Sequence, residues 1–116
     1  QLPTAAMAAL TTALGTDSAM QVPDKLHKHA VPLFQPPGCD VPLVAGCAGW
    51  LVCRLIPEDR NQQVYDLFIG EVTSAWADAR LFENGRWQFD QAPDAMRTIH
   101  HVAGGHYLVS GAGLQG

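Results

Sequence analysis

The middle of the chain shows a pattern typical of β-strands. Within residues 48–56, Leu51, Cys53 and Leu55 fall on one face, Trp50, Val52, Arg54 and Ile56 fall on the other, and Pro57 ends the run. Residues 64–75 are apolar on both faces over much of their length and rich in β-branched and aromatic types, which favours a central strand. We therefore expect Tyr65–Val72 to be a buried core strand, with a bend or close backbone approach at Gly70.

Two hairpins are predicted in the last third of the chain. Asn84 and Gly85 separate two short runs of apolar and polar residues, which is the strongest local signal for a two-residue β-turn. Residues 97–102 and 106–110 form a second strand pair around Gly104 and Gly105. Between the hairpins, residues 90–96 predict a short helical or irregular segment.

Helices are predicted near the N-terminus. Thr4 suits a helix cap and Gly15 a helix stop, with an alanine-rich stretch between them. Pro23 suits the first position of a short helix at residues 24–29. The four prolines and Gly38 within residues 32–42 predict an extended, turn-rich crossing. Residues 58–63 are expected to form a connection and residues 111–116 a loose tail.

These elements predict a mostly β domain with short helices. About five strands are expected, too few to close a barrel, so at least one sheet edge would stay unpaired. We therefore interpret residues 1–116 as a single partial domain.

Composition narrows the functional classes. A content of 47% hydrophobic and 16% charged residues is that of a globular protein with one core. The net charge is -4 and no basic run is present, which argues against nucleic acid as a partner. No apolar stretch approaches the ~20 residues of a membrane helix, and no signal-peptide pattern opens the chain, so no membrane partner is expected.

The cysteines indicate a reducing compartment. Cys39, Cys47 and Cys53 form no CxxC pair, and an odd number argues against a secreted disulfide scaffold. We therefore expect a cytoplasmic protein. Cys47 and Cys53 lie in an apolar run and are expected to be buried, whereas the pattern leaves Cys39 undetermined.

The histidines do not predict a metal site. His27 and His29 diverge on a helix, and His100 and His101 point to opposite faces of a strand. His101 and His106, facing each other across the Gly104–Gly105 turn, are the best of the pairs, and we expect no bound metal.

Other catalytic patterns are weak. The letters of residues 111–116 match GxGxxG but lack the following helix that this motif needs, and no serine has a nucleophile-elbow context. A loop with Ser18, followed by Asp24 and Lys25 at a helix start, could hold a phosphate, although a solvated surface patch is the commoner reading of such residues.

Several segments, read in order, resemble the flavin reductase-like family. Residues 47–56 look like that family's strand ending in cysteine and arginine, and residues 66–72 look like its most recognisable signature, in which histidine is frequent at the position of Tyr65. Residues 40–44, the Asp24–Lys25 pair and residues 101–107 follow in the family's order.

This resemblance implies an FMN-binding split β-barrel whose first part is absent from this chain. It implies FMN as cofactor, NAD(P)H as co-substrate, a homodimer, and the N-terminal half of the same domain as a partner. Ser18, Asp24 and Lys25 match positions near the FMN phosphate and ribityl chain. No acid or base is required from this chain, so no catalytic residue is assigned.

Two alternatives stay open at this point. One keeps FMN but is an electron-transfer or flavin-storage module that does not oxidise nicotinamide. The other is a non-catalytic β interaction domain whose apolar strands pair with a partner.

Overall fold

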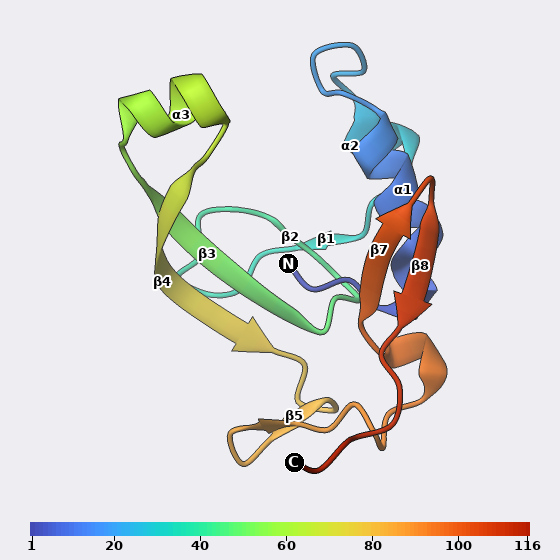
Figure 1. Cartoon of the computed structure of the whole chain (residues 1–116). Coiled ribbons are helices and arrows are strands. Elements are labelled where there is room, and N and C mark those ends of the chain that lie inside the picture. The colour runs from blue at the N-terminus through green and yellow to red at the C-terminus, as the bar shows by residue number, and fades with distance from the viewer.

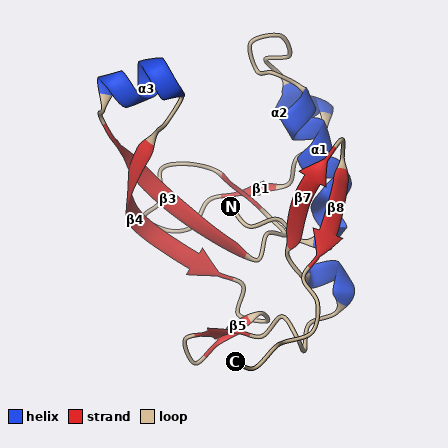
Figure 2. Cartoon of the chain, viewed as in Figure 1, coloured by secondary structure: helices blue, strands red, loops and turns tan.

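The computed structural model describes residues 1–116 and consists mainly of short strands with few helices (Figures 1 and 2), as predicted. The helices are η1 (Ala5–Met7), α1 (Ala8–Thr16), α2 (Lys25–Lys28), α3 (Asp59–Tyr65) and η2 (Asp94–Met96). The strands are β1 (Leu33–Phe34), β2 (Leu43–Val44), β3 (Gly49–Ile56), β4 (Ile69–Ala77), β5 (Phe82–Glu83), β6 (Arg86–Trp87), β7 (Ile99–Ala103) and β8 (His106–Val109). They form four two-stranded antiparallel sheets, β1–β2, β3–β4, β5–β6 and β7–β8.

The β3–β4 hairpin is the longest sheet and carries α3 at its tip (Figure 1). Its register pairs Trp50 with Trp76 at the base and Ile56 with Ile69 at the tip, with a bulge between Val52 and Cys53. The predicted strand at residues 48–56 is confirmed as β3, because alternating apolar side chains and the closing Pro57 are local signals.

The buried strand predicted at Tyr65–Val72 is wrong in its bounds and in its burial. Tyr65 is the last residue of α3, Asp66 ends that helix with φ of 49°, and β4 begins only at Ile69. Phe68 is 63% exposed. The helix was missed because Asp59–Tyr65 is mostly polar, so it shows no apolar stripe.

The N-terminal helices agree with the prediction in position and differ at their ends. Thr4 makes no cap hydrogen bond and instead donates from Oγ1 to the Gly46 carbonyl oxygen at 3.1 Å. Gly15 does not stop the helix, because α1 runs to Thr16. Pro23 lies before the short helix, which starts at Lys25.

Both predicted C-terminal hairpins are confirmed. Asn84 and Gly85 adopt φ values of 50° and 75°, the left-handed conformations that a tight type I′ turn requires, and β5 pairs with β6 across them. Gly104 and Gly105 also have positive φ and connect β7 to β8. The short helix expected in residues 90–96 is η2.

The core is small and divided into two clusters. One contains Cys39, Leu43, Cys47 and Trp50, and the other contains Ala48, Leu81 and Ala92. Cys47 is buried as predicted and Cys39 is buried too, but Cys53 is exposed because it lies on the uncovered part of β3. No helix of the chain has both the length and the apolar character needed to cross a membrane.

The N-terminal segment lies between two hairpins. Leu2 forms an antiparallel bridge with Gly49 at the start of β3, and Thr4 forms another with Thr98 just before β7. These bridges join the β3–β4 and β7–β8 hairpins through the first residues of the chain.

Candidate functional site

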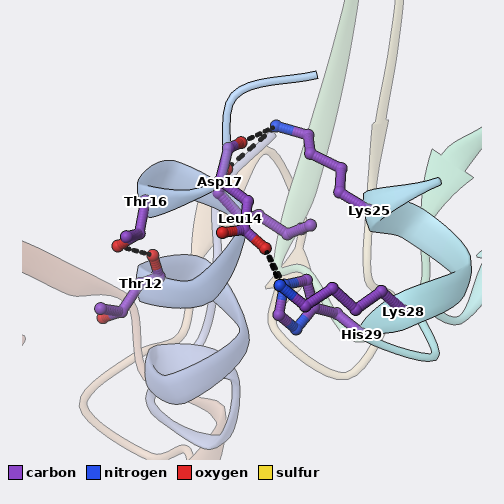
Figure 3. Close-up of polar contacts among 7 residues, drawn as sticks. All are labelled: Thr12, Leu14, Thr16, Asp17, Lys25, Lys28 and His29. Atoms are coloured by element: carbon purple, nitrogen blue, oxygen red, sulfur yellow. Dashed lines mark hydrogen bonds and ion pairs between the residues drawn. The ribbon is translucent and has the colours of Figure 1, made fainter. Parts of the chain in front are cut away.

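The three residues predicted to contact a ligand lie close together in sequence, between α1 and α2. Ser18 is in the loop that follows α1, Asp24 is the residue before α2, and Lys25 is the first residue of α2. Figure 3 shows how Lys25 reaches back toward the end of α1.

Lys25 holds the end of α1 in place. Its ammonium nitrogen donates to the carbonyl oxygens of Leu14 at 3.0 Å and Asp17 at 2.9 Å. The last carbonyl groups of an α-helix have no partner within the helix, so a lysine at this position satisfies them. An ammonium carries three N–H donors, and Lys25 therefore keeps one for a ligand.

Asp17 connects α1 to the far end of α2. Its Oδ2 atom accepts from the Lys28 Nζ at 2.7 Å and lies 2.8 Å from the His29 Nε2 (Figure 3). The hydrogen bond from Lys28, and then that from His29, hold the pKa of the Asp17 carboxyl below its ordinary value of 3.8. Both lysines of the chain, Lys25 and Lys28, are thus directed to this junction.

Ser18 and Asp24 have side-chain groups that can form further hydrogen bonds. Ser18 Oγ accepts a long hydrogen bond of 3.3 Å from the Met20 amide, which leaves its hydroxyl proton available to donate. The Asp24 side chain makes no cap hydrogen bond to α2. The junction therefore offers an ammonium N–H and a hydroxyl to an anionic group, with the carboxylates of Asp17 and Asp24 beside them.

No hollow of the surface is lined by Ser18, Asp24 or Lys25. A polar hollow of about 400 Å³ lies instead between α1 and the β7–β8 hairpin, lined by Thr11, Thr12, Gly15, Thr16, His101, Gly105 and Tyr107. The Thr12 and Tyr107 hydroxyls are 3.0 Å apart and bind α1 to β8. Pattern reasoning missed this hollow because its two walls are about 90 residues apart in sequence.

A second, mainly apolar hollow of about 180 Å³ lies on another side of α1, where Met7, Leu10 and Leu14 face Val44 and Cys47. Met7 of η1 thus lines the same hollow as Leu10 and Leu14 of α1. Gln1 and Thr11 are the polar residues that line this second hollow.

The chain contains no group of three or more histidine, cysteine, aspartate or glutamate side chains that could hold a metal ion. The prediction that His101 and His106 face each other across the turn is wrong. The register shifts after His101, which pairs with Tyr107, while His106 pairs with Ala103. The His101 and Tyr107 rings lie 5.1 Å apart, so this end of the hairpin presents an imidazole beside a phenol.

Comparison with known proteins finds similar solved structures and a curated sequence relative. The FMN-binding domain of a flavin reductases-like enzyme from Shewanella baltica OS155 matches all of this chain, with 46% identity and a TM-score of 0.95, over 61% of its own length. Nitrilotriacetate monooxygenase component B from Bacillus cereus matches 98% of this chain and 56% of its own, with a TM-score of 0.69. At 18% identity, that second match shows likeness of fold alone.

The curated relative is the uncharacterized protein YddH of Escherichia coli (strain K12). It is 44% identical over 89 residues, which cover 76% of this chain and 46% of YddH. No family model matches the chain. The chain thus spans between about half and three fifths of the length of the proteins it matches. The match to the Shewanella domain confirms the resemblance to the flavin reductase-like family that the sequence motifs predict.

Proposed function

We propose that this chain is part of an FMN-binding flavin reductase-like protein, in which NAD(P)H reduces the flavin by hydride transfer. The observation that carries the proposal is the match over the whole chain to an FMN-binding domain, with 46% identity and a TM-score of 0.95. Likeness of this degree makes a shared cofactor the first hypothesis to test.

The α1–α2 junction fits the phosphate end of FMN. Lys25 retains one N–H donor after binding the Leu14 and Asp17 carbonyls, and Ser18 retains its hydroxyl proton. A phosphate accepts several charge-assisted hydrogen bonds, so these two donors would bind it. Asp24 would face the ribityl hydroxyl groups, for which a carboxylate is a suitable acceptor.

The chemistry in this proposal comes from the cofactor: bound FMN supplies the ring that accepts and passes on the hydride. The residues of this chain bind and orient one end of the molecule. No side chain of the chain needs to act as an acid or a base.

The remaining parts of the proposal concern the whole protein. We propose a split β-barrel completed by an N-terminal half of the same domain, a homodimer, and a cytoplasmic location. The exposed apolar side chains of β3, β4 and the loop between α3 and β4 support a covering partner, since such side chains seldom stay in water as a group. The free thiols of Cys39, Cys47 and Cys53 support a reducing compartment.

The test is a titration of the longer protein that contains this chain with FMN, followed by flavin fluorescence and by colour of the purified sample. We expect saturable binding that is weakened by Lys25→Ala and unchanged by substitution of an exposed residue far from the junction, such as Leu114→Ala in the C-terminal tail. A protein that is folded, colourless and without affinity for FMN would refute it.

Hydride transfer is tested separately, by adding NADH or NADPH to the FMN-loaded protein without oxygen. Bleaching of the flavin absorbance at a rate proportional to bound protein supports the reductase. Bound FMN that neither nucleotide bleaches would instead favour the electron-transfer or storage module.

A further inference from the structure

Asp17 joins α1 to both ends of α2. Its amide donates to the Ala13 carbonyl oxygen of α1 at 3.1 Å, and its own carbonyl oxygen accepts from the Lys25 ammonium at 2.9 Å. At the other end of α2, its carboxylate lies 2.7 Å from Lys28 Nζ and 2.8 Å from His29 Nε2 (Figure 3). The position of the Lys25 ammonium therefore depends on how the Asp17 side chain is held.

His29 is the partner of this carboxylate whose charge changes near neutral pH, because imidazole is the side chain that ordinarily titrates between about pH 5 and pH 8. The side chains of His29 and Asp17 are both 20% exposed, whereas that of Lys28 is 50% exposed. Water and salt therefore screen the contact of His29 with Asp17 less than that of Lys28. A change in the charge of His29 is felt directly at Asp17.

The fixed charges of the junction balance one another. Residues 5–38 contain six ionisable side chains, which are Asp17, Asp24, Lys25, His27, Lys28 and His29. Near neutral pH the two lysines carry two positive charges and the two aspartates two negative charges. The charge of His29 therefore decides whether its own contact with Asp17 leaves the junction neutral or positive toward an approaching anion.

The other histidines nearby do not contact this carboxylate. His27 is exposed on α2 and makes no hydrogen bond to Asp17. The β7–β8 hairpin packs on α1 through Tyr107 and Thr12 and carries three histidines, none of which forms a hydrogen bond or ion pair with the junction: His100, His101 and His106. His29 is thus the histidine through which pH acts on Asp17.

We propose that His29 is a positioning residue of the phosphate site, which holds the Lys25 ammonium in place through Asp17 and, as an imidazolium, strengthens the attraction of the junction for phosphate. The inference rests on the proposed function, because the anion is the phosphate of FMN. The Nε2–H group can donate to the carboxylate in the neutral and in the charged ring, so the contact persists when the ring loses its charge. FMN affinity therefore has one component from the contact and another from the charge.

Two substitutions separate these components. His29→Gln keeps an N–H donor and is neutral at every pH, whereas His29→Ala removes the donor and the charge. His27→Gln is the matched control, because it removes an exposed imidazole of the same helix that does not contact Asp17. The Kd for FMN is measured for each variant of the longer protein by flavin fluorescence, at about pH 5.5 and about pH 8.

The phosphate of the ligand changes its own charge near about pH 6, so absolute affinities mix two titrations. The ratio of the Kd of each variant to that of the wild type removes this effect, because the ligand is the same in both measurements. Riboflavin is the second probe, since it has the ring and the ribityl chain of FMN without the phosphate. The Tm of each variant is measured at both pH values to show that the protein is folded.

We expect His29→Gln to bind FMN as the wild type does at high pH, and about threefold to tenfold more weakly at low pH, as for loss of one nearby charge that water partly screens. His29→Ala should bind FMN more weakly at both pH values. His27→Gln should equal the wild type, and the Kd for riboflavin should not change in any variant.

Three results would overturn the inference. A Kd ratio for His29→Gln that is the same at both pH values would exclude the role of the charge. Wild-type affinity of His29→Ala would exclude the positioning role. Equal effects of His29→Gln and His27→Gln, or equal effects on FMN and riboflavin, would show a general change of the protein in place of an action on the phosphate.

Failure of the proposed function gives a different result. A folded wild-type protein that binds neither FMN nor riboflavin would refute the proposed function and this inference together. A wild-type protein that binds FMN, with no effect of either substitution at His29, would refute the inference alone.

Discussion

The ammonium of Lys25 lies 3.0 Å from the carbonyl oxygen of Leu14, eleven residues earlier in the chain. The residue that the sequence motifs place near a phosphate is thus also the residue that completes the end of α1. Both roles are compatible, because the ammonium has one donor more than the two carbonyls use. Removal of the Lys25 side chain should therefore affect both the stability of the fold and the binding of a phosphate.

Replacement of Lys25 by alanine should therefore change both stability and FMN binding. Loss of two hydrogen bonds from a charged donor should lower the free energy of unfolding by about 1–3 kcal/mol, and loss of a phosphate contact should raise the Kd for FMN about tenfold. Lys28→Ala is the matched control: it removes an exposed ion pair with Asp17 and should change the Tm little. Equal effects of the two substitutions on both measurements would contradict this distinction.

Asp17→Asn should remove part of the acid sensitivity of the fold. Lys28 and His29 lower the pKa of Asp17 in the folded chain, so its charge stabilises the fold above the ordinary value of 3.8 and this contribution is lost as the pH falls through the lower folded-state pKa. The Tm difference between the wild type and Asp17→Asn should shrink below about pH 4. A difference that does not change with pH would show that the carboxylate charge contributes nothing.

Leu81→Ala and Phe68→Ala should differ strongly in how much they lower the free energy of unfolding of this chain. Leu81 is 1% exposed in the second core cluster, so its truncation should cost about 2–5 kcal/mol of the free energy of unfolding. Phe68 is 63% exposed, and its truncation should cost less than about 0.5 kcal/mol. Chemical denaturation measures both, and a large loss at Phe68 would restore the buried strand that the sequence predicts.

The three thiols should react at different rates. Cys53 is exposed, whereas Cys39 is 8% and Cys47 3% exposed. Burial also raises the pKa of the Cys47 thiol, which reduces the fraction of reactive thiolate. A thiol reagent at neutral pH should label Cys53 first and Cys47 only on unfolding, and early labelling of Cys47 would contradict the first core cluster.

The parts of the fold that the sequence predicts well depend on local signals. The Asn84–Gly85 turn depends on two residues that tolerate positive φ, and β3 depends on alternation closed by proline, so neither needs distant contacts. The same holds for the position of α2 after Pro23.

Tertiary geometry decides what the sequence misses. Burial of a strand depends on what packs against it. The β-branched composition of β4 predicts a buried strand, but β4 has only β3 beside it, so its side chains stay exposed in this chain. The sequence also places Lys25 at a candidate site but cannot show that the carbonyls of Leu14 and Asp17 take two of its donors. The polar hollow depends on α1 and β8 meeting through Thr12 and Tyr107, a contact without a local signal.

Trp50 gives the chain an optical reporter of its own core. The indole is 8% exposed, donates from Nε1 to the Val44 carbonyl oxygen at 2.9 Å, and packs with Cys39, Leu43 and Cys47. Trp87 is 39% exposed and stacks on Phe89, outside that cluster. Emission from Trp50 should therefore shift to longer wavelength when the core opens, together with that of Trp76, which packs against the same cluster, whereas Trp87 already emits from a wetter environment.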